Sequence, residues 1–150
     1  MQLTSLLFSS SPSDMADGLA PVVKQNIDSL KQWHPQGEHV LFFEAQAREF
    51  IQSHFSAEVV RAFDTLRPYA YKADLARYCI LHQQGGIYAD LSYFFVNRLP
   101  VATDRMVVFR DFFWSSPWDT SNGLIAAPPR HKALQRAIEM VCENVRRDYY

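Results

Sequence analysis

Residues 71–92 of this 150-residue chain read YKADLARYCILHQQGGIYADLS and combine a helix, a stop signal and a strand. The spacing predicts a helix over Tyr71–Gln84, for which Gly85-Gly86 is the expected C-terminal stop. The stretch Ile87–Val96 is rich in Tyr, Phe, Ile and Val and is predicted to be a strand. A helix that leads directly into a strand is typical of an α/β fold.

The segments on either side of this stretch extend the same pattern. The resulting order of elements predicts α/β architecture with a mostly parallel sheet flanked by helices. The last helix is predicted to run to Tyr150 with no capping Gly or following Pro, as in a helix that continues in a longer chain. The further expected strands are Leu3–Ser9, Val40–Phe43, Arg105–Phe109 and Leu124–Ala127, and the further expected helices are Pro21–Trp33, Ala45–His54, Ala57–Leu66 and the segment that Pro128-Pro129 opens.

Composition narrows the class of protein. A chain of 150 residues with 48% hydrophobic side chains is long enough for one domain with a real core. A formal net charge of −1 argues against binding to nucleic acid or an anionic membrane, which requires a basic surface. The two cysteines, Cys79 and Cys142, form no zinc-binding pattern and are expected to be buried thiols. No stretch approaches the roughly 18 apolar residues of a membrane helix, so we expect a soluble, cytoplasmic chain.

The predicted helix over Tyr71–Gln84 carries three charged side chains in its first half. Asp74 and Arg77 are three residues apart and share a face, whereas Lys72 points elsewhere. Taken alone, this pair is most simply an ordinary helix-surface ion pair worth about 0.2–0.5 kcal/mol.

The strand that follows carries a second set of polar residues. Alternation places Tyr88, Asp90 and Ser92 on one side of the strand. A carboxylate on an apolar strand is costly unless it is paired, bound to a cation or at the strand's end, so Asp90 is expected near the carboxyl end, where α/β sheets bind ligands. The alternatives are a turn aspartate at position 90, core packing for Tyr88 and no role for Ser92. Asn122-Gly123 is a turn by default.

The whole stretch resembles the sugar-nucleotide-binding core of glycosyltransferase family 32, to which the clostridial glucosylating toxin core is related. The family pattern has a basic residue, a small residue, Asp, two residues and Arg-Tyr, then a helix that ends in Gly-Gly and a strand with Ile/Val-Tyr-x-Asp-x-Asp. Flanking stretches at residues 50–78 and 122–138 also match, so the resemblance covers roughly Val40 to Val145. The matching positions are Lys72, Asp74, Arg77, Tyr78, Gly85, Gly86, Ile87, Tyr88 and Asp90.

The resemblance implies a GT-A fold, a Rossmann-like domain that binds nucleotide sugars, with residues 1–150 forming one such domain or its N-terminal core. Asp74 and Arg77 would hold hydroxyls of the transferred sugar and the neighbouring phosphate, and Lys72 would assist. Asp90 would contact the ribose, a divalent cation or both. The implied catalytic residues are Asp74, Arg77 and Asp90, and the implied substrate-binding residues also include Lys72, Tyr88 and Asn122.

The second Asp of the family's strand motif is Ser92 in this chain. A hydroxyl is a weak, neutral ligand, so a Mn²⁺ or Mg²⁺ site formed by Asp90 and Ser92 would lack one formal negative charge. We therefore expect a weakened metal site.

The resulting hypothesis is an enzyme that moves a hexose from a nucleotide diphosphate sugar to a glycan or related acceptor with retention of configuration. The alternative is a catalytically degenerate sugar-nucleotide-binding or interaction domain with the same fold; a purely structural α/β module is the third possibility. Two more sets of residues are candidates for ligand contact: Phe8 or Ser9 for the base, and the cluster Phe112, Phe113, Trp114 and Trp118 for a sugar.

Overall fold

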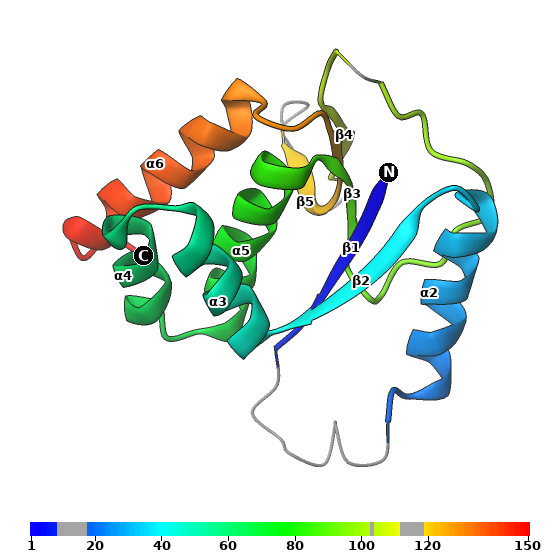
Figure 1. Ribbon diagram of the computed structural model, residues 1–150, viewed down its shortest axis with the longest axis horizontal. Helices are drawn as coiled ribbons and strands as arrows, with labels where there is room; N and C mark the ends of the chain where they lie inside the picture. Colours follow the sequence, from blue (N-terminus) through cyan, green and yellow to red (C-terminus); the bar gives the residue numbers. More distant parts are fainter. Residues whose placement is uncertain (9–17, 103, 112–118) are drawn as a thin grey trace.

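The computed structural model describes residues 1–8, 18–102, 104–111 and 119–150, and these form a single five-stranded sheet with helices on both faces (Figure 1). The sequence order is strand, helix, strand, three helices, three strands and a final helix, as predicted. The strands are β1 (Gln2–Leu7), β2 (Glu38–Phe43), β3 (Gly86–Ala89), β4 (Val107–Arg110) and β5 (Thr120–Ala127).

The sheet has the strand order β2-β1-β3-β5-β4. β1 pairs in parallel with β2 and with β3, whereas β5 is antiparallel to both of its neighbours, β3 and β4. β4 therefore runs in the same direction as β1, β2 and β3, and β5 alone runs the other way. The prediction of a mostly parallel α/β sheet is confirmed.

Four helices cover one face of the sheet and one helix covers the other (Figure 1). On the first face lie α3 to α6, whose buried residues pack with Leu6, Tyr88 and Ile125. On the second face, Leu30 packs with Leu3 and alternate residues of β3 and β5. The helices are α2 (Pro21–Trp33), α3 (Glu44–His54), α4 (Ala57–Thr65), α5 (Tyr69–Gln84) and α6 (Lys132–Arg146).

The helix α5 is the central element of the first face. Its residues Leu75, Cys79 and Ile80 are fully buried, because neighbouring helices and the sheet surround it. Gly85 ends the helix with φ +65°, and Gly86 follows with φ +102° against the Gln2 carbonyl. Only glycine adopts these conformations without strain, so the chain reverses from helix into β3 within two residues.

The predicted strand over Ile87–Val96 is wrong beyond Ala89, because β3 has only four residues. The segment after it is held by side chains of α2 instead of by a neighbouring strand. Asn26 Nδ2 donates to the Leu91 carbonyl at 2.8 Å, and the Ser29 hydroxyl accepts the Phe95 N–H at 2.9 Å. Strand propensity in the sequence does not reveal such tertiary hydrogen bonds, so the predicted strand extends beyond the observed end of β3.

The end of the last helix also differs from the prediction. α6 ends at Arg146, and Asp148 adopts a left-handed conformation with φ +51°. The Asp148 N–H donates to the Val145 carbonyl and the Tyr149 N–H to the Asn144 carbonyl, which is a Schellman closure. Aspartate takes the position that glycine usually occupies, because its short side chain tolerates this region.

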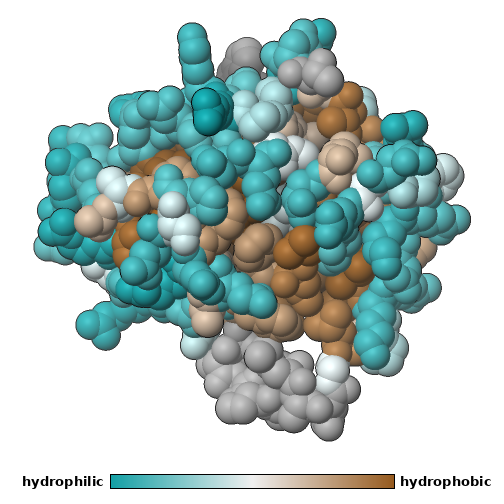
Figure 2. Space-filling view, viewed as in Figure 1, coloured by the Kyte–Doolittle hydropathy of each residue, from teal (hydrophilic) through white to brown (hydrophobic). Residues whose placement is uncertain are grey.

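Apolar surface gathers on the face shown in Figure 2, over the region where Figure 1 draws β1 and β2. β2 lies at one edge of the sheet, and its residues Val40 to Phe43 are half-buried. In the part of the chain that the structure describes, no helix is long and apolar enough to cross a membrane.

The junction at Gly86 provides a test of the fold. Gly86→Ala would place a Cβ against the Gln2 backbone, and we expect the free energy of unfolding to fall by more than about 2 kcal/mol. Gly18→Ala is the control: Gly18 also has positive φ, +77°, but among the described residues its Cβ would meet only Lys24 Nζ, at 4.0 Å. It should cost only the backbone strain, about 1 kcal/mol. Urea denaturation measures both, and equal losses would contradict the steric argument.

Candidate functional site

A cluster of polar side chains lies where α5 passes the carboxyl end of β3. Asp74 and Arg77 come from α5, and the Arg77 Nη2 to Asp74 Oδ1 distance is 3.1 Å. Asp90 directly follows β3, and its N–H still donates to the Gly123 carbonyl of β5 at 2.8 Å. The predicted position of Asp90 at the end of its strand is therefore the observed one. Ligands bind at this edge of open α/β sheets.

Arg77 is the buried centre of the cluster. Its side chain is 6% exposed, and its Nη1 lies 3.4 Å from Asp90 Oδ1. The same Nη1 donates to the Asn122 carbonyl at 2.8 Å. A buried guanidinium is stable only when charge and hydrogen bonds compensate it, and here two carboxylates and one backbone carbonyl do so. This excludes the reading of Asp74 and Arg77 as an isolated surface pair.

Tyr88 supports both Arg77 and Asp90. Its hydroxyl donates to Asp90 Oδ1 at 2.5 Å, and the Arg77 guanidinium lies over its ring at 4.6 Å from the centroid. Burial raises the pKa of Tyr88, so its hydroxyl keeps its proton and remains a donor. The ring is also part of the core, so packing and site support are combined in one side chain.

Asn122 joins the cluster from the opposite side. Its Nδ2 donates to Asp74 Oδ1 at 3.0 Å. The default turn at Asn122-Gly123 is wrong, since both residues lie within β5. A Cβ at Gly123 would lie 2.6 Å from Asp90 Oδ2, which shows that this strand glycine serves close approach rather than a turn.

The Asp74 carboxyl also has a shifted pKa. Burial raises the pKa of Asp74 above its usual value, and the Arg77 charge and the Asn122 hydrogen bond oppose that rise only in part. Its side chain is 34% exposed, so this carboxyl remains accessible to a ligand. Perturbed carboxyls in such positions are typical of functional sites.

Two predicted residues lie apart from the cluster. Lys72 Nζ pairs with Glu44 Oε1 at 2.5 Å and lies over the Phe63 ring, so it faces α3. Ser92 lies in the turn after β3, exposed to solvent, because the strand ends before it. Its predicted alignment with Tyr88 and Asp90 on one side of a strand is wrong.

Sequence reasoning missed the contact between Tyr93 and Ser121. The Tyr93 hydroxyl lies 3.0 Å from the Ser121 hydroxyl, which ties the turn after β3 to β5. It also missed the close approach at Gly123, for which a glycine inside the run 120–127 was the available signal.

The residues predicted to contact the base or a sugar lie outside the cluster or outside the described residues. Phe8 packs edge-on against Phe63 in the core. Ser9 and the aromatic residues of 112–118 lie outside the described residues.

Within the described ranges, no group of three or more His, Cys, Asp or Glu side chains could hold a metal ion. Mg²⁺, however, is commonly held by one or two carboxylates together with substrate phosphates and water. Asp90 is 38% exposed and fits such a role, because its partners Arg77 and Tyr88 both engage Oδ1 rather than Oδ2.

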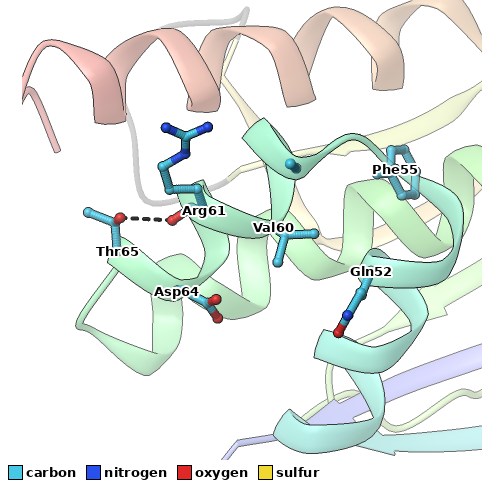
Figure 3. A pocket seen from close by; sticks show the side chains of 7 residues that line it. Gln52, Phe55, Val60, Arg61, Asp64 and Thr65 are labelled. Atoms are coloured by element: carbon cyan, nitrogen blue, oxygen red, sulfur yellow. Dashed lines mark hydrogen bonds between the residues drawn. The ribbon is translucent and has the colours of Figure 1, made fainter.

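A cavity of about 470 Å³ lies away from this cluster, along α3 and α4 (Figure 3). Its lining includes Asp64, which Arg48 binds through two hydrogen bonds of 2.7 and 2.8 Å. The Thr65 hydroxyl there donates to the Arg61 carbonyl. None of Asp74, Arg77, Asp90 and Asn122 lines this cavity, so it is separate from the polar cluster.

The mixed sheet with helices on both faces defines an α/β domain of GT-A type, with the polar cluster at its strand ends. The solved structure of PaToxG glycosyltransferase has the same fold, with a TM-score of 0.71, 14% identity and coverage of 97% of this chain and 60% of that chain. The family described as "Glycosyltransferase sugar-binding region containing DXD motif" matches residues 21–111, more than half of the chain. The chain belongs to this glycosyltransferase family.

Sequence relatives agree with this assignment. The yeast Saccharomyces cerevisiae has two similar proteins, the mannosyl phosphorylinositol ceramide synthases SUR1, 32% identical over 71% of this chain, and CSH1, 29% identical over 78%. An uncharacterized glycosyltransferase, L373, of Acanthamoeba polyphaga mimivirus is 46% identical over 29% of this chain and 18% of its own length. The chain spans only 27% and 30% of the length of the two yeast proteins.

The raised pKa of Asp74 predicts that removing its charge costs little stability. A carboxyl whose pKa is higher in the folded state stabilises most below the unfolded value of 3.8, and this contribution is lost as pH rises through the folded pKa. Asp74→Asn removes one of the two carboxylates that compensate Arg77, but burial already disfavours the Asp74 charge, so the variant should lose less than about 1 kcal/mol at pH 7. The loss should increase as pH falls toward 4, because the wild type then gains that contribution.

Asp64→Asn is the matched control for that measurement. The hydrogen bond with Arg48 lowers the pKa of Asp64. The Asp64 carboxylate therefore stabilises the fold at pH values above 3.8, and Asp64→Asn should lose stability at pH 7. Chemical denaturation at both pH values compares the two variants. A loss for Asp74→Asn as large as that for Asp64→Asn would show that the Asp74 charge stabilises the fold.

Proposed function

We propose that this chain transfers a hexose from a nucleotide diphosphate sugar to a hydroxyl group of an acceptor. The observation that carries the proposal is the buried Arg77 guanidinium, held between Asp74 and Asp90 at the carboxyl end of β3. A diphosphate leaving group gains negative charge as the glycosidic bond breaks, and a fixed cation in a low-dielectric site stabilises that charge without reorganisation.

Each group of the cluster has a role that its chemistry supports. Asp74 and Asn122 offer a carboxylate and an amide at adjacent positions, which suits hydrogen bonds to sugar hydroxyls. Arg77 orients the sugar and faces the neighbouring phosphate. Asp90, steadied by Tyr88, binds the ribose or a cation.

The transfer is proposed to retain the configuration of the sugar. The anomeric carbon–oxygen bond to the phosphate breaks while a bond from the acceptor oxygen forms on the same face, and the acceptor proton passes to the departing phosphate. Among the described residues, the carboxylates of the cluster are Asp74 and Asp90, and both bind Arg77. A carboxylate paired with Arg77 suits positioning of the substrate rather than attack on the anomeric carbon, so the proposed reaction forms no covalent glycosyl-enzyme intermediate.

A divalent cation, Mn²⁺ or Mg²⁺, is the proposed cofactor, with Asp90 as its main protein ligand and Ser92 as a weak one. Such an ion would neutralise charge on the diphosphate. Mannose is the proposed sugar, because two similar proteins are named as mannosyl phosphorylinositol ceramide synthases. Lys72, paired with Glu44, would act on substrate only after release from that partner.

The first test is donor binding by saturation-transfer NMR with GDP-mannose and UDP-sugars, followed by donor hydrolysis. Asp90→Asn keeps the shape of the side chain and removes its charge, and we expect hydrolysis to fall by at least about 10²-fold. The control is Asp104→Asn, an exposed carboxylate that pairs only with Arg105 among the ion pairs of the described residues.

Three results would be informative. Loss of hydrolysis in a variant that remains folded at the assay temperature supports the proposed role of Asp90. Donor binding with no turnover in the wild type would instead favour a catalytically degenerate sugar-nucleotide-binding domain, for which Ser92 is the supporting observation. No donor signal at all would exclude both readings for this chain.

Ser92→Asp tests the proposed cation site. A second carboxylate in the exposed turn adds a charged oxygen ligand, so Mn²⁺ affinity in the presence of GDP should rise on the order of tenfold. Ser92→Asn is the neutral control of similar size. Calorimetric titration gives both affinities, and equal values for the Asp and Asn variants would place the cation away from residue 92.

A further inference from the structure

The residues Asp90–Tyr93 form the turn that carries both proposed cation ligands. The Tyr93 N–H donates to the Asp90 carbonyl at 3.1 Å, which closes the turn. Ser92 is not among the described residues that combine a side chain with a positive φ, so the turn is of type I rather than type II. The closing bond does not involve the middle peptide of the turn, whose orientation decides where the Ser92 side chain points.

A side chain of α2 binds that middle peptide. Asn26 Nδ2 donates to the Leu91 carbonyl at 2.8 Å, and Asn26 is only 8% exposed. The Leu91 carbonyl and the Ser92 N–H belong to one planar peptide unit, so a bond to the carbonyl fixes the direction of both groups. Asn26 therefore acts on Ser92 through the backbone.

The same helix also binds the chain beyond the turn, but at a different place. The Ser29 hydroxyl accepts the Phe95 N–H at 2.9 Å, and Trp33 Nε1 donates to the Phe95 carbonyl at 3.1 Å. These bonds hold residue 95 against α2 and leave the orientation of the middle peptide to Asn26. Ser29, which is 4% exposed, is thus a buried polar residue of the same helix with a comparable bond outside the turn.

The far end of the turn is fastened to β5. Tyr93 Oη lies 3.0 Å from Ser121 Oγ. A Cβ on Gly123 would lie 2.6 Å from Asp90 Oδ2 and 3.2 Å from Tyr93 Oη, so these two oxygens share the space over the strand glycine. Asp90 Oδ1, by contrast, is engaged from α5 and β3. The Tyr93 side chain therefore lies on the side of the carboxylate proposed to meet a ligand.

A fixed turn matters more for Ser92 than it would for an aspartate. A hydroxyl is a weak, neutral ligand, and it contributes to binding only if its direction is set before the ligand arrives. A displacement of about 1 Å in a ligand-binding group costs up to about 10²-fold in function. The bond from Asn26 reduces exactly this freedom, because it prevents rotation of the peptide that precedes Ser92.

We propose that Asn26 is a positioning residue of the cation and diphosphate site. It acts through the Leu91–Ser92 peptide, while the hydroxyl pair of Tyr93 and Ser121 holds the other end of the turn. This inference rests on the proposed transferase function. The helix α2, on the opposite face of the sheet from α5, is then part of the machinery that prepares the chain for its donor.

The first test observes the turn without any ligand. Asn26→Leu keeps a side chain of similar volume and removes the donor, so the middle peptide is free to rotate. We expect relaxation-dispersion NMR to show exchange at the Ser92 and Tyr93 amides of this variant and not of the wild type. Asn26→Ala is a second variant without the donor and takes the place of the Leu variant if that chain does not fold.

Ser29→Ala is the matched control. It removes a bond between the same helix and the Phe95 N–H, so exchange should appear near residue 95 and not at the Ser92 amide. Calorimetric titration of Mn²⁺ in the presence of GDP extends the comparison to binding. We expect Asn26→Leu to weaken Mn²⁺ binding on the order of tenfold and Ser29→Ala by less than about twofold.

A double-mutant cycle tests the second attachment of the turn. Tyr93→Phe and Ser121→Ala each remove one hydroxyl of the same pair, so each should weaken Mn²⁺ binding by the same factor. The double variant should then be no weaker than either single variant, because the bond is already lost. Additive losses would show that the two hydroxyls act independently and would overturn the role of the pair in holding the turn.

Two results would overturn the role of Asn26. One is an Asn26→Leu chain whose Ser92 and Tyr93 amides show no exchange. The other is equal weakening of Mn²⁺ binding by Asn26→Leu and Ser29→Ala, which would mean that α2 supports the fold in general rather than the turn in particular. Failure of the wild type to bind Mn²⁺ with GDP is a separate result: it contradicts the proposed cation site, and the ligand-free NMR comparison still decides whether Asn26 fixes the turn.

Discussion

The burial of one guanidinium is the interaction on which this site depends. Arg77 lies in the core of the domain, where an uncompensated charge would be prohibitive, and Asp74, Asp90 and the Asn122 carbonyl compensate it from three different elements. The helix α5 and the strands β3 and β5 must therefore pack in the one arrangement that brings these groups to Arg77. The residues that recognise a ligand are also those that make the buried cation tolerable.

That constraint explains several local features that otherwise look unrelated. β3 ends at Ala89, Asp90 follows it beside Arg77, and α2 holds the next segment through Asn26 and Ser29. Gly123 has no side chain because the Asp90 carboxylate occupies the space. Tyr88 is kept protonated by burial and so can serve both the core and the carboxylate.

The sequence predicted most elements well where Pro or Gly punctuates the chain. The helix over Pro21–Trp33 matches its predicted bounds, and α5 begins two residues before the predicted start, just after Pro68. The errors at the end of β3 and at the strand position of Asn122-Gly123 fall where tertiary contacts decide. The left-handed Asp148 is a different error, because local backbone hydrogen bonds close α6 there without the usual glycine. The pair of Asp74 and Arg77 follows from helix spacing, but its meeting with Asp90 and Asn122 does not, because contacts across 45 or more residues leave no local pattern.

The long sequence separation within the site has a consequence for folding. Asn122 contacts residues 45 and 48 positions earlier in the chain, so the cluster is complete only after β5 has docked on β3. Contacts of this kind form late, because loop closure must precede them. A ligand that bridges the cluster would bind only the docked state and would stabilise it by mass action. Binding competence would then report directly on whether the antiparallel strand has joined the sheet.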